Sequence, residues 1–325
     1  MVNFTLKQLR YFEAVARHGH FGRAAEACAI SQPALSVQIR ELENALGAAV
    51  FDRTPRQVRL TGFGEQCAQQ VRAILREVDA LGDLARTAGD LLSGRLRLGV
   101  IPTVAPYLLP ALIGDLGRSH PGLDIHVRET VTPGLIAELA EGRIDAAIVA
   151  LPISEPSLVE TPIFAESFKL VRHLSERDKP VPNGETLRRM RLLLLEEGHC
   201  FRDQALSFCH VGHAVPREGL DGSSLTTLVQ MVGAGIGVTL IPDMAVAVET
   251  RSAPVCVAAF PDPQPSRTVG MIWRKTNPLA DQLMQLADIV QQSVMTMRNQ
   301  QMNTDAADAH AGVLAPLVKA GQTLR

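Results

Sequence analysis

The sequence predicts an α+β protein with a small helical head, one long connecting helix and a larger body of alternating strands and helices. In the first 60 residues, three segments with apolar residues at helical spacing are followed by a short hairpin pattern. Residues 61–90 contain no proline and keep a single apolar stripe. From residue 95 onward, runs of Val, Ile and Leu alternate with amphipathic segments, which is typical of α/β units.

The composition is that of a globular protein, with 46% apolar and 20% charged residues. No apolar run approaches the roughly eighteen residues that a membrane span needs, and the N-terminus has no signal-peptide pattern. We therefore expect a cytoplasmic protein without a membrane partner. Five cysteines at irregular spacing in 325 residues do not make a disulfide framework. Any pair that matters is expected to be catalytic, metal-binding or redox-sensing.

The net charge of −2 is unevenly distributed. Residues 1–60 contain eight Lys and Arg against five acidic residues, so this segment carries +3 and the remainder −5. A basic head on an acidic body is typical of a DNA-binding module, although an ordinary solvated surface can reach the same charge.

Each helix of the head has a start signal. Thr5 and Gln8 form a capping box for the first helix, and a second short helix is expected from Gly22. Ser31 is a strong N-cap for the third helix, with Pro33 in its first turn, where proline is tolerated.

The third helix is predicted to enter the major groove of DNA. Its core stripe consists of Leu35, Ile39, Leu42 and Leu46. The opposite face and the N-terminal turns then remain free to contact base edges, as in a helix-turn-helix. Residues 50–61 predict a hairpin wing whose arginines could follow the phosphate backbone. The predicted DNA-binding residues are Ser31, Gln32, Pro33, Ser36, Val37, Arg40, Arg53, Arg56 and Arg59.

The long helix from residue 61 to about 90 is predicted to mediate dimerisation. Its stripe consists of Val71, Ile74, Val78, Leu81 and Ala85. Such a narrow stripe on a helix roughly 40 Å long is typical of a coiled-coil seam, and a two-fold dimer predicts a palindromic DNA site. The alternative is that this helix packs against its own C-terminal domain.

The body is predicted to contain two α/β units. Strands are expected at 95–101, 123–129 and 145–150 and helices at 107–119 and 134–141, which implies a parallel sheet. A second unit begins near residue 164, with a buried strand at 191–196 and a helix at 225–233. A strand at 269–273 and a helix at 278–297 return to the first unit. A ligand would lie in the cleft between the units.

The head resembles the winged helix-turn-helix of LysR-type transcriptional regulators. The matching positions are Leu9–Phe12, Ala24, Ala25, Ser31–Ser36, Ile39, Leu42, Glu43, Leu46, Gly47, Leu60, Thr61 and Gly64. Val37 departs from the pattern, because many members have a basic residue there. The body resembles the two-lobed, periplasmic-binding-protein-like regulatory domain of the same family.

This resemblance implies a domain plan. The expected parts are a winged helix-turn-helix (1–60), a linker and dimerisation helix (61–91), lobe I (92–163), lobe II with a redox segment (164–267), a return to lobe I (268–300) and a tail without predicted order (301–325).

Residues 194–209 resemble the redox segment of OxyR, the peroxide-sensing subfamily, and residues 101–110 and 267–270 match it as well. Cys200 follows a predicted buried strand and begins a predicted helix, between His199 and Arg202. Cationic neighbours and a helix N-terminus both stabilise a thiolate, the form that attacks peroxide. Cys209 is the candidate resolving thiol. In a helix the two cysteines would stand roughly 13 Å apart along the axis, so a disulfide would require unwinding.

Further site residues come from the resemblance alone. It implies a peroxide pocket of Thr103, Thr132, His199, Arg202 and Arg267. On sequence grounds, helix capping or a turn is the simpler role for both threonines. The remaining cysteines, Cys28, Cys67 and Cys256, lie in apolar patterns and are expected to be inert.

The resemblance implies a non-enzymatic regulator of oxidative-stress genes with hydrogen peroxide as its signal and no cofactor. Its expected partners are double-stranded DNA, further copies of the chain in a homodimer and tetramer, and RNA polymerase. A LysR-type regulator responding to an organic effector is the main alternative. A zinc sensor using Cys200, Cys209, His210 and His213 is a second, although the spacing matches no common zinc motif. A thiol peroxidase is the third, but it would have no use for the head.

Overall fold

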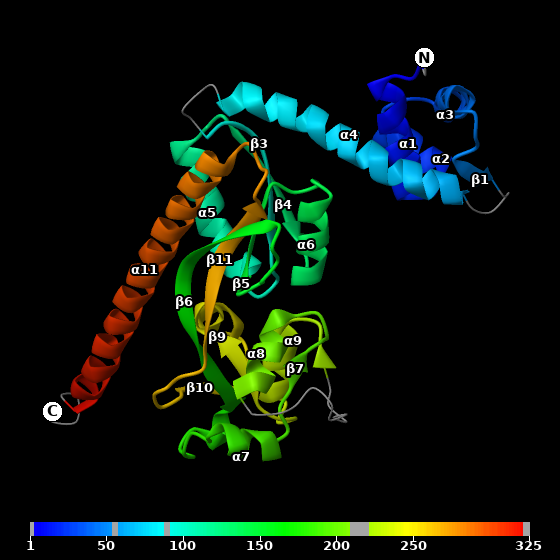
Figure 1. Ribbon diagram of the computed structural model, residues 1–325. Coiled ribbons are helices and arrows are strands. Elements are labelled where there is room, and N and C mark those ends of the chain that lie inside the picture. The colour runs from blue at the N-terminus through cyan, green and yellow to red at the C-terminus, as the bar shows by residue number, and fades with distance from the viewer. Residues whose placement is uncertain (1–2, 54–57, 88–91, 209–220, 321–325) are drawn as a thin grey trace. The chain divides into compact units, whose positions relative to one another are not determined.

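The computed structural model describes residues 3–53, 58–87, 92–208 and 221–320. It divides into two compact units, Met1–Gly89 and Asp90–Arg325 (Figure 1). Within the described ranges, no helix combines the length and apolarity that crossing a bilayer would demand.

The first unit is a helical head with a two-stranded wing. Its elements are α1 (Leu6–His18), α2 (Phe21–Ala27), α3 (Gln32–Leu46), β1 (Phe51–Arg53), β2 (Val58–Leu60) and α4 (Gly62–Thr87). The predicted capping box is present, because the Thr5 side chain accepts from Gln8 N and the Gln8 side chain accepts from Thr5 N. Ser31 caps α3 by accepting from Ala34 N at 3.3 Å. His20, whose ring accepts from the first amides of α2, is a cap that the sequence pattern did not reveal.

Helix α4 has a divided apolar stripe. Val71 is buried in the core of the head, together with Ala68. Ile74 and Leu81, further along the same helix, are exposed. The described part of α4 therefore uses its first turns to complete the core of the head, which does not cover Ile74 or Leu81.

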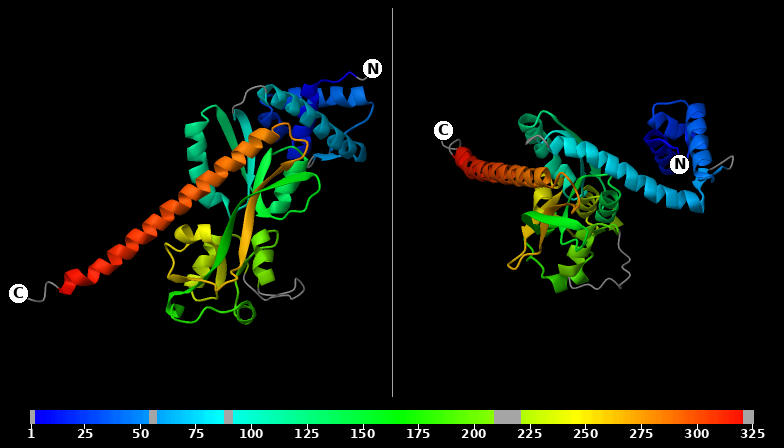
Figure 2. Two further views of the ribbon diagram at one scale, coloured as in Figure 1. Left: turned by 60° about the vertical axis from the view of Figure 1, so that its left-hand side comes forward. Right: turned by 45° about the horizontal axis from the view of Figure 1, so that its top comes forward.

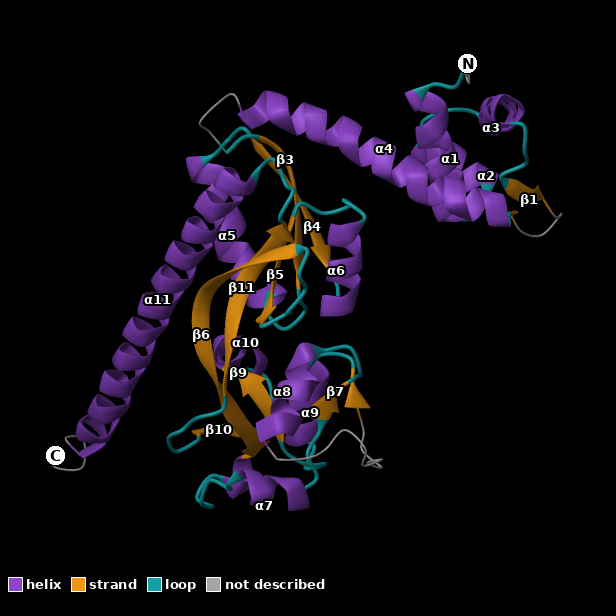
Figure 3. Ribbon diagram, viewed as in Figure 1, coloured by secondary structure: helices purple, strands orange, loops and turns teal. Residues whose placement is uncertain are grey.

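The second unit is built on one seven-stranded sheet. Its first strands are β3 (Gly94–Val100), β4 (Leu123–Glu129), β5 (Ala146–Leu151) and β6 (Leu158–His173), joined by α5 (Ala105–Ser119) and α6 (Thr132–Ala140). The remaining strands are β9 (Thr239–Pro242), β10 (Val255–Ala259) and β11 (Ser266–Arg274). The strand order is β10-β6-β11-β5-β3-β4, with β9 also paired to β6. Right-handed crossovers in opposite directions place α5 and α6 on opposite faces, which Figure 3 shows.

The parallel sheet predicted from the strands at 95–101, 123–129 and 145–150 is confirmed, because β3 pairs parallel with both β4 and β5. Strand β11 (Ser266–Arg274), which the sequence assigned to the same unit, pairs antiparallel with both β5 and β6. The reason is that β11 enters the sheet from the far lobe, without the helical crossover that a parallel strand needs.

The two longest strands, β6 and β11, carry the chain from one lobe to the other (Figures 1 and 2). Residues 158–167 of β6 pair with β11, whereas residues 168–173 pair with β9 (Thr239–Pro242) and β10 (Val255–Ala259). The crossing point is the register pair Glu166 and Arg267. We call the part of the unit between these two residues lobe II and the remainder lobe I.

Lobe II surrounds the β6–β9–β10 end of the sheet. Its other elements are α7 (Gly184–Arg189), β7 (Leu194–Leu195), α8 (Cys200–Phe208), β8 (Asp221–Gly222), α9 (Leu225–Gly233) and α10 (Val246–Glu249), with 3-10 turns at Leu174–Glu176 and Asp243–Ala245. The strand predicted at 191–196 is shorter than expected. Only two residues form a ladder, with β8, and Leu192 makes a single bridge to Val238.

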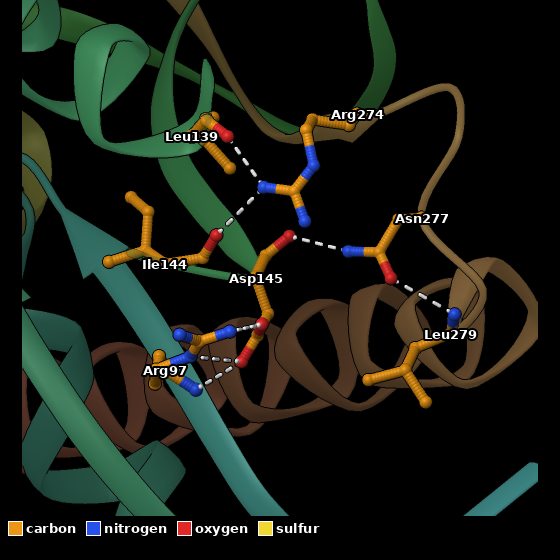
Figure 4. A network of polar contacts seen from close by, with 7 residues as sticks. All are labelled: Arg97, Leu139, Ile144, Asp145, Arg274, Asn277 and Leu279. Carbon is orange, nitrogen blue, oxygen red and sulfur yellow. Dashed lines mark hydrogen bonds and ion pairs between the residues drawn. The ribbon is translucent and has the colours of Figure 1, made fainter. Parts of the chain in front are cut away.

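The last helix, α11 (Ala280–Ala320), begins on lobe I and continues as helical backbone through most of the predicted tail. A polar network fixes its start (Figure 4). Asp145 accepts from Arg97 Nη2 at 2.6 Å and from Arg97 N at 2.8 Å, and its carbonyl accepts from Asn277 Nδ2 at 3.0 Å. Arg274 donates to the carbonyls of Leu139 and Ile144. The turn between β11 and α11 is thereby tied to the end of α6 and the start of β5.

Each lobe has its own apolar core, but one side chain belongs to the opposite lobe. Tyr107 lies on α5, whose neighbours Leu108 and Leu112 pack in the lobe I core. The Tyr107 ring is instead buried in the lobe II core, beside Phe168 and Phe201. Its hydroxyl donates to Glu249 Oε1 at 2.6 Å. Burial and the adjacent Glu249 carboxylate raise the pKa of Tyr107 well above its usual range, so the phenol remains a donor.

Candidate functional site

The centre of the candidate site is Arg267, at the point where β6 and β11 cross between the lobes. Its side chain is fully buried, and so is that of its cross-strand partner Glu166. Arg267 Nε donates to Glu166 Oε1 at 2.9 Å, and Nη2 lies 2.7 Å from the same oxygen. The other carboxylate oxygen of Glu166 accepts from Met244 N at 3.2 Å. A buried ion pair with these additional hydrogen bonds has a fixed geometry.

Thr103 is held by the same guanidinium. Arg267 Nη1 donates to Thr103 Oγ1 at 2.7 Å, and Nη2 donates to the Thr103 carbonyl at 3.0 Å. Thr103 lies two residues before α5 and is buried. The structure thus brings together two predicted pocket residues that are 164 positions apart in the chain. It also gives Thr103 a definite partner in place of the simpler capping role.

Cys200 lies at the boundary of the lobes, one residue before the ring that the Arg267 guanidinium covers. It is the first residue of α8, as predicted, and its thiol is half-buried against the lobe I core. The next residue, Phe201, belongs to the lobe II core, and its ring lies under the Arg267 guanidinium at 5.6 Å. Cys200 thus stands at the N-terminal end of a nine-residue helix.

Thr132 approaches the redox segment from α6. Gly198 has φ +93°, and a Cβ atom at this position would lie 3.7 Å from Val131 Cγ2. The turn before Cys200 therefore lies against the residue that precedes Thr132. The Thr132 hydroxyl is buried and has no hydrogen-bond partner among the described residues. An unpaired buried hydroxyl at this position is available to a small polar ligand.

His199 and Arg202 have other surroundings. Burial lowers the pKa of His199, with Glu196 opposing the shift, so its ring favours the neutral form. Arg202 donates to the Leu195 carbonyl at 2.7 Å and pairs with Asp221 at 2.9 Å, at the β7–β8 ladder. Neither residue contacts the Arg267 guanidinium through a described hydrogen bond, unlike Thr103.

Sequence reasoning missed Glu166 and the Tyr107–Glu249 pair. A signal for Glu166 was present, because Phe164, Glu166 and Phe168 alternate along β6 and are all buried. A carboxylate on the apolar face of a strand requires a partner, which the sequence alone did not identify.

The partner thiol predicted for Cys200 lies outside the described residues, as do His210 and His213 of the zinc alternative. Among the residues whose positions are described, no cluster of three or more His, Cys, Asp or Glu could hold a metal ion. Of the remaining cysteines, Cys256 is buried, with its thiol 3.5 Å from the His173 carbonyl. Cys28 and Cys67 are half-buried, and burial raises the pKa of both thiols.

The candidate DNA-binding face lies on α3 and β2 of the head. Gln32, Pro33, Val37 and Arg40 are exposed on α3, as the prediction requires, and Arg59 is exposed on β2. Ser31 is exposed and also caps the helix. Ser36 is partly exposed. The side chain of Arg53 and the whole of Arg56 lie outside the described part of the chain.

Two family models match the chain. Residues 6–65 match the bacterial regulatory helix-turn-helix protein, lysR family, and residues 89–294 match the LysR substrate binding domain. The chain belongs to the LysR family of bacterial transcriptional regulators.

The similar proteins carry a more particular name. The chain is 41% identical over 292 residues to the hydrogen peroxide-inducible genes activator of Dickeya chrysanthemi, covering 88% of this chain and 95% of the relative. It is 40% identical over 290 residues to the dual regulator OxyR of Escherichia coli, covering 88% and 94%.

Solved structures give the same result. A full-length OxyR variant from Pseudomonas aeruginosa matches with a TM-score of 0.70 and 36% identity, over 89% of this chain and 95% of that one. A hydrogen-peroxide-bound mutant of Corynebacterium glutamicum OxyR matches with a TM-score of 0.64 and 32% identity, over 94% and 99%. Within the LysR family, the chain belongs to the OxyR group.

Proposed function

We propose that this chain is a DNA-binding transcriptional regulator that senses hydrogen peroxide through Cys200. The observation that carries the proposal is the position of this thiol. It begins α8 at the lobe boundary, one residue before the Phe201 ring that lies under Arg267, and it follows a turn that lies against Val131, the residue before Thr132 with its unpaired hydroxyl. The relatives named as peroxide-inducible activators and the peroxide-bound OxyR structure support the same chemistry.

The reaction proceeds in two balanced steps. The Cys200 thiolate attacks one peroxide oxygen, so an S–O bond forms, the O–O bond breaks, and the departing hydroxide takes a proton to become water. Cysteine sulfur is oxidised and peroxide reduced. The Cys209 thiol then attacks the sulfenic sulfur, forming the disulfide and releasing a second water. Hydroxyl groups at Thr103 and Thr132 and the second hydrogen on Arg267 Nη1, which has no acceptor among the described residues, would hold the peroxide and stabilise the departing oxygen.

The length of α8 makes the second step a conformational switch. From Cys200 to Phe208 the helix rises about 12 Å, at 1.5 Å per residue. Adjacent Cα atoms are about 3.8 Å apart, so while this helix is intact the Cα atom of residue 209 must stay at least about 8 Å from that of Cys200. A disulfide needs Cα atoms no more than about 7 Å apart. Oxidation therefore requires α8 to unwind, and the unwound segment would alter the packing of lobe II.

The DNA-binding part of the proposal rests on the exposed face of α3. We propose that α3 enters the major groove and that Arg40 and Arg59 contact phosphates, with Arg53 and Arg56 of the wing. Exposed apolar residues on α4 support a dimer through this helix. A groove of about 420 Å³ beside them, lined by Phe4, Phe63, Val71 and Ile74 among others, would accept a second copy. Assembly of dimers into a tetramer on palindromic sites, contact with RNA polymerase and a cytoplasmic location complete the proposal.

Mass spectrometry of the full-length protein, read beside DNA footprinting, tests this function. After treatment with a small excess of peroxide, we expect a Cys200–Cys209 disulfide and a changed footprint. Cys200→Ser should abolish both. Cys256→Ser, at a buried thiol on the edge strand β10, is the matched control and should respond as the wild type does. A normal peroxide response in Cys200→Ser would refute the redox mechanism, and a zinc ion in the reduced protein would favour the metal alternative.

A further inference from the structure

The positive charge at the centre of the candidate site is compensated by a buried carboxylate of the same chain. Arg267 is the guanidinium at its centre, and its side chain and that of Glu166 are both 0% exposed. Their closest approach is 2.7 Å, and the two residues are register partners on adjacent strands, so strand pairing itself holds them together. The lobe boundary therefore presents a neutral pair to a ligand.

The hydrogen-bonding capacity of Arg267 is also nearly used. The described hydrogen bonds employ Nε, one hydrogen of Nη1 and one hydrogen of Nη2. A guanidinium has five N–H donors in all, and of the two that these bonds leave, the one on Nη2 belongs to the nitrogen that forms the ion pair with Glu166 at 2.7 Å. A carboxylate effector prefers two parallel N–H donors and an uncompensated positive charge. Neither is available while Glu166 is in place.

We propose that Glu166 is a specificity-determining residue, which restricts this site to a small uncharged ligand by occupying the face of Arg267 that an anionic effector would bind. The inference rests on the proposed function and deepens it. Hydrogen peroxide is uncharged, needs little space, and can accept one hydrogen bond from Nη1 while it contacts Thr103 and Thr132. An organic acid would have to displace a fully buried carboxylate that also accepts from Met244 N at 3.2 Å.

Two alkylating reagents of nearly equal size test the charge of the site. Iodoacetamide is neutral and iodoacetate is an anion, and both react with the Cys200 thiolate. The ratio of their rates at Cys200, followed by peptide mass spectrometry on the full chain, is independent of the thiolate fraction. In Glu166→Gln the Arg267 charge becomes uncompensated, so iodoacetate should gain at least about tenfold relative to iodoacetamide. Glu166→Asp retains the negative charge and should keep the wild-type ratio.

Asp145→Asn is the matched control. Asp145 is also a buried carboxylate bound to an arginine, Arg97, but it lies in the network at the start of α11 (Figure 4). This variant should lose stability without changing the alkylation ratio. An unchanged ratio in folded Glu166→Gln, or a shift of equal size in Asp145→Asn, would overturn the proposal.

A measurement on the wild-type protein covers the case in which Glu166→Gln does not fold. Sodium acetate, compared with sodium chloride at the same ionic strength, should leave the rate of Cys200 oxidation by peroxide unchanged. Slowing of the wild-type reaction by acetate would contradict the inference. The alkylation ratio needs no peroxide, so its outcome is separate from failure of the proposed redox function, which would appear as absence of the disulfide.

Discussion

Replacing Thr132 by valine should separate stability from peroxide reactivity. The Thr132 hydroxyl is buried and has no partner among the described residues, so its removal deletes an unsatisfied polar group. Valine has nearly the same shape. We therefore expect the free energy of unfolding to stay the same or rise by up to about 1 kcal/mol. If the hydroxyl binds peroxide during the reaction, the lost hydrogen bond is worth about 1.5–3 kcal/mol in the transition state, or roughly 10- to 150-fold in rate.

Thr103→Val provides the contrast. The Thr103 hydroxyl accepts from Arg267 Nη1 at 2.7 Å, so its loss leaves a buried guanidinium hydrogen without an acceptor. We expect this variant to lose about 1–3 kcal/mol of stability as well as reactivity. Urea unfolding measures the stabilities, and rapid quenching with a thiol reagent measures the oxidation rate of Cys200. A Thr132→Val variant that is destabilised by more than about 1 kcal/mol, or that reacts at the wild-type rate, would refute the reasoning.

Three further predictions concern the helix seam, the histidine and the wing. Leu81 is 68% exposed on α4. Leu81→Glu should convert the dimer to a monomer, as measured by sedimentation, and should weaken binding to a palindromic site by more than tenfold. An unchanged dimer would exclude α4 as its interface. Burial lowers the pKa of His199 below the usual histidine value of about 6.5, so its contribution to stability is present above that pH and is lost as the pH falls below it. His199→Gln should flatten this part of the pH–stability curve, and identical curves would contradict the assignment. Arg59→Ala should weaken binding equally on specific and scrambled DNA and reduce the salt slope by about one, whereas a loss confined to the specific site would indicate base contact instead.

The elements that depend on local pattern were predictable. The strand at 123–129 and the helix at 225–233 have the predicted bounds, and the first strand and helix of the body differ by one or two residues. Periodicity and capping residues determine such elements directly. The N-cap role of His20 was not predicted, because histidine is an uncommon N-cap. Its ring accepts a hydrogen bond from Gly22 N at 3.0 Å.

Long-range pairing was not predictable from the same signals. The antiparallel direction of β11 in the sheet was not predicted, because strand direction depends on where the chain comes from and not on local sequence. The same limit applies to the site. Resemblance to a known family supplied Thr103 and Arg267, whereas the partner of Arg267 required the register of β6 and β11. Glu166 carried only the weak signal of a charged residue on a buried strand face.

The Tyr107 side chain limits how this regulator can transmit a signal. Since its ring belongs to lobe I by sequence and to the lobe II core by packing, swinging the lobes apart would pull an aromatic ring into water and break its bond to Glu249. That would cost several kcal/mol, from about 25 cal/mol per Å² of exposed apolar surface and one lost hydrogen bond. Opening of the two lobes about a hinge is therefore energetically unfavourable in this domain. In the proposed mechanism, oxidation acts instead on the short helix that begins at Cys200, so this helix would refold while Tyr107 keeps the two lobes in contact.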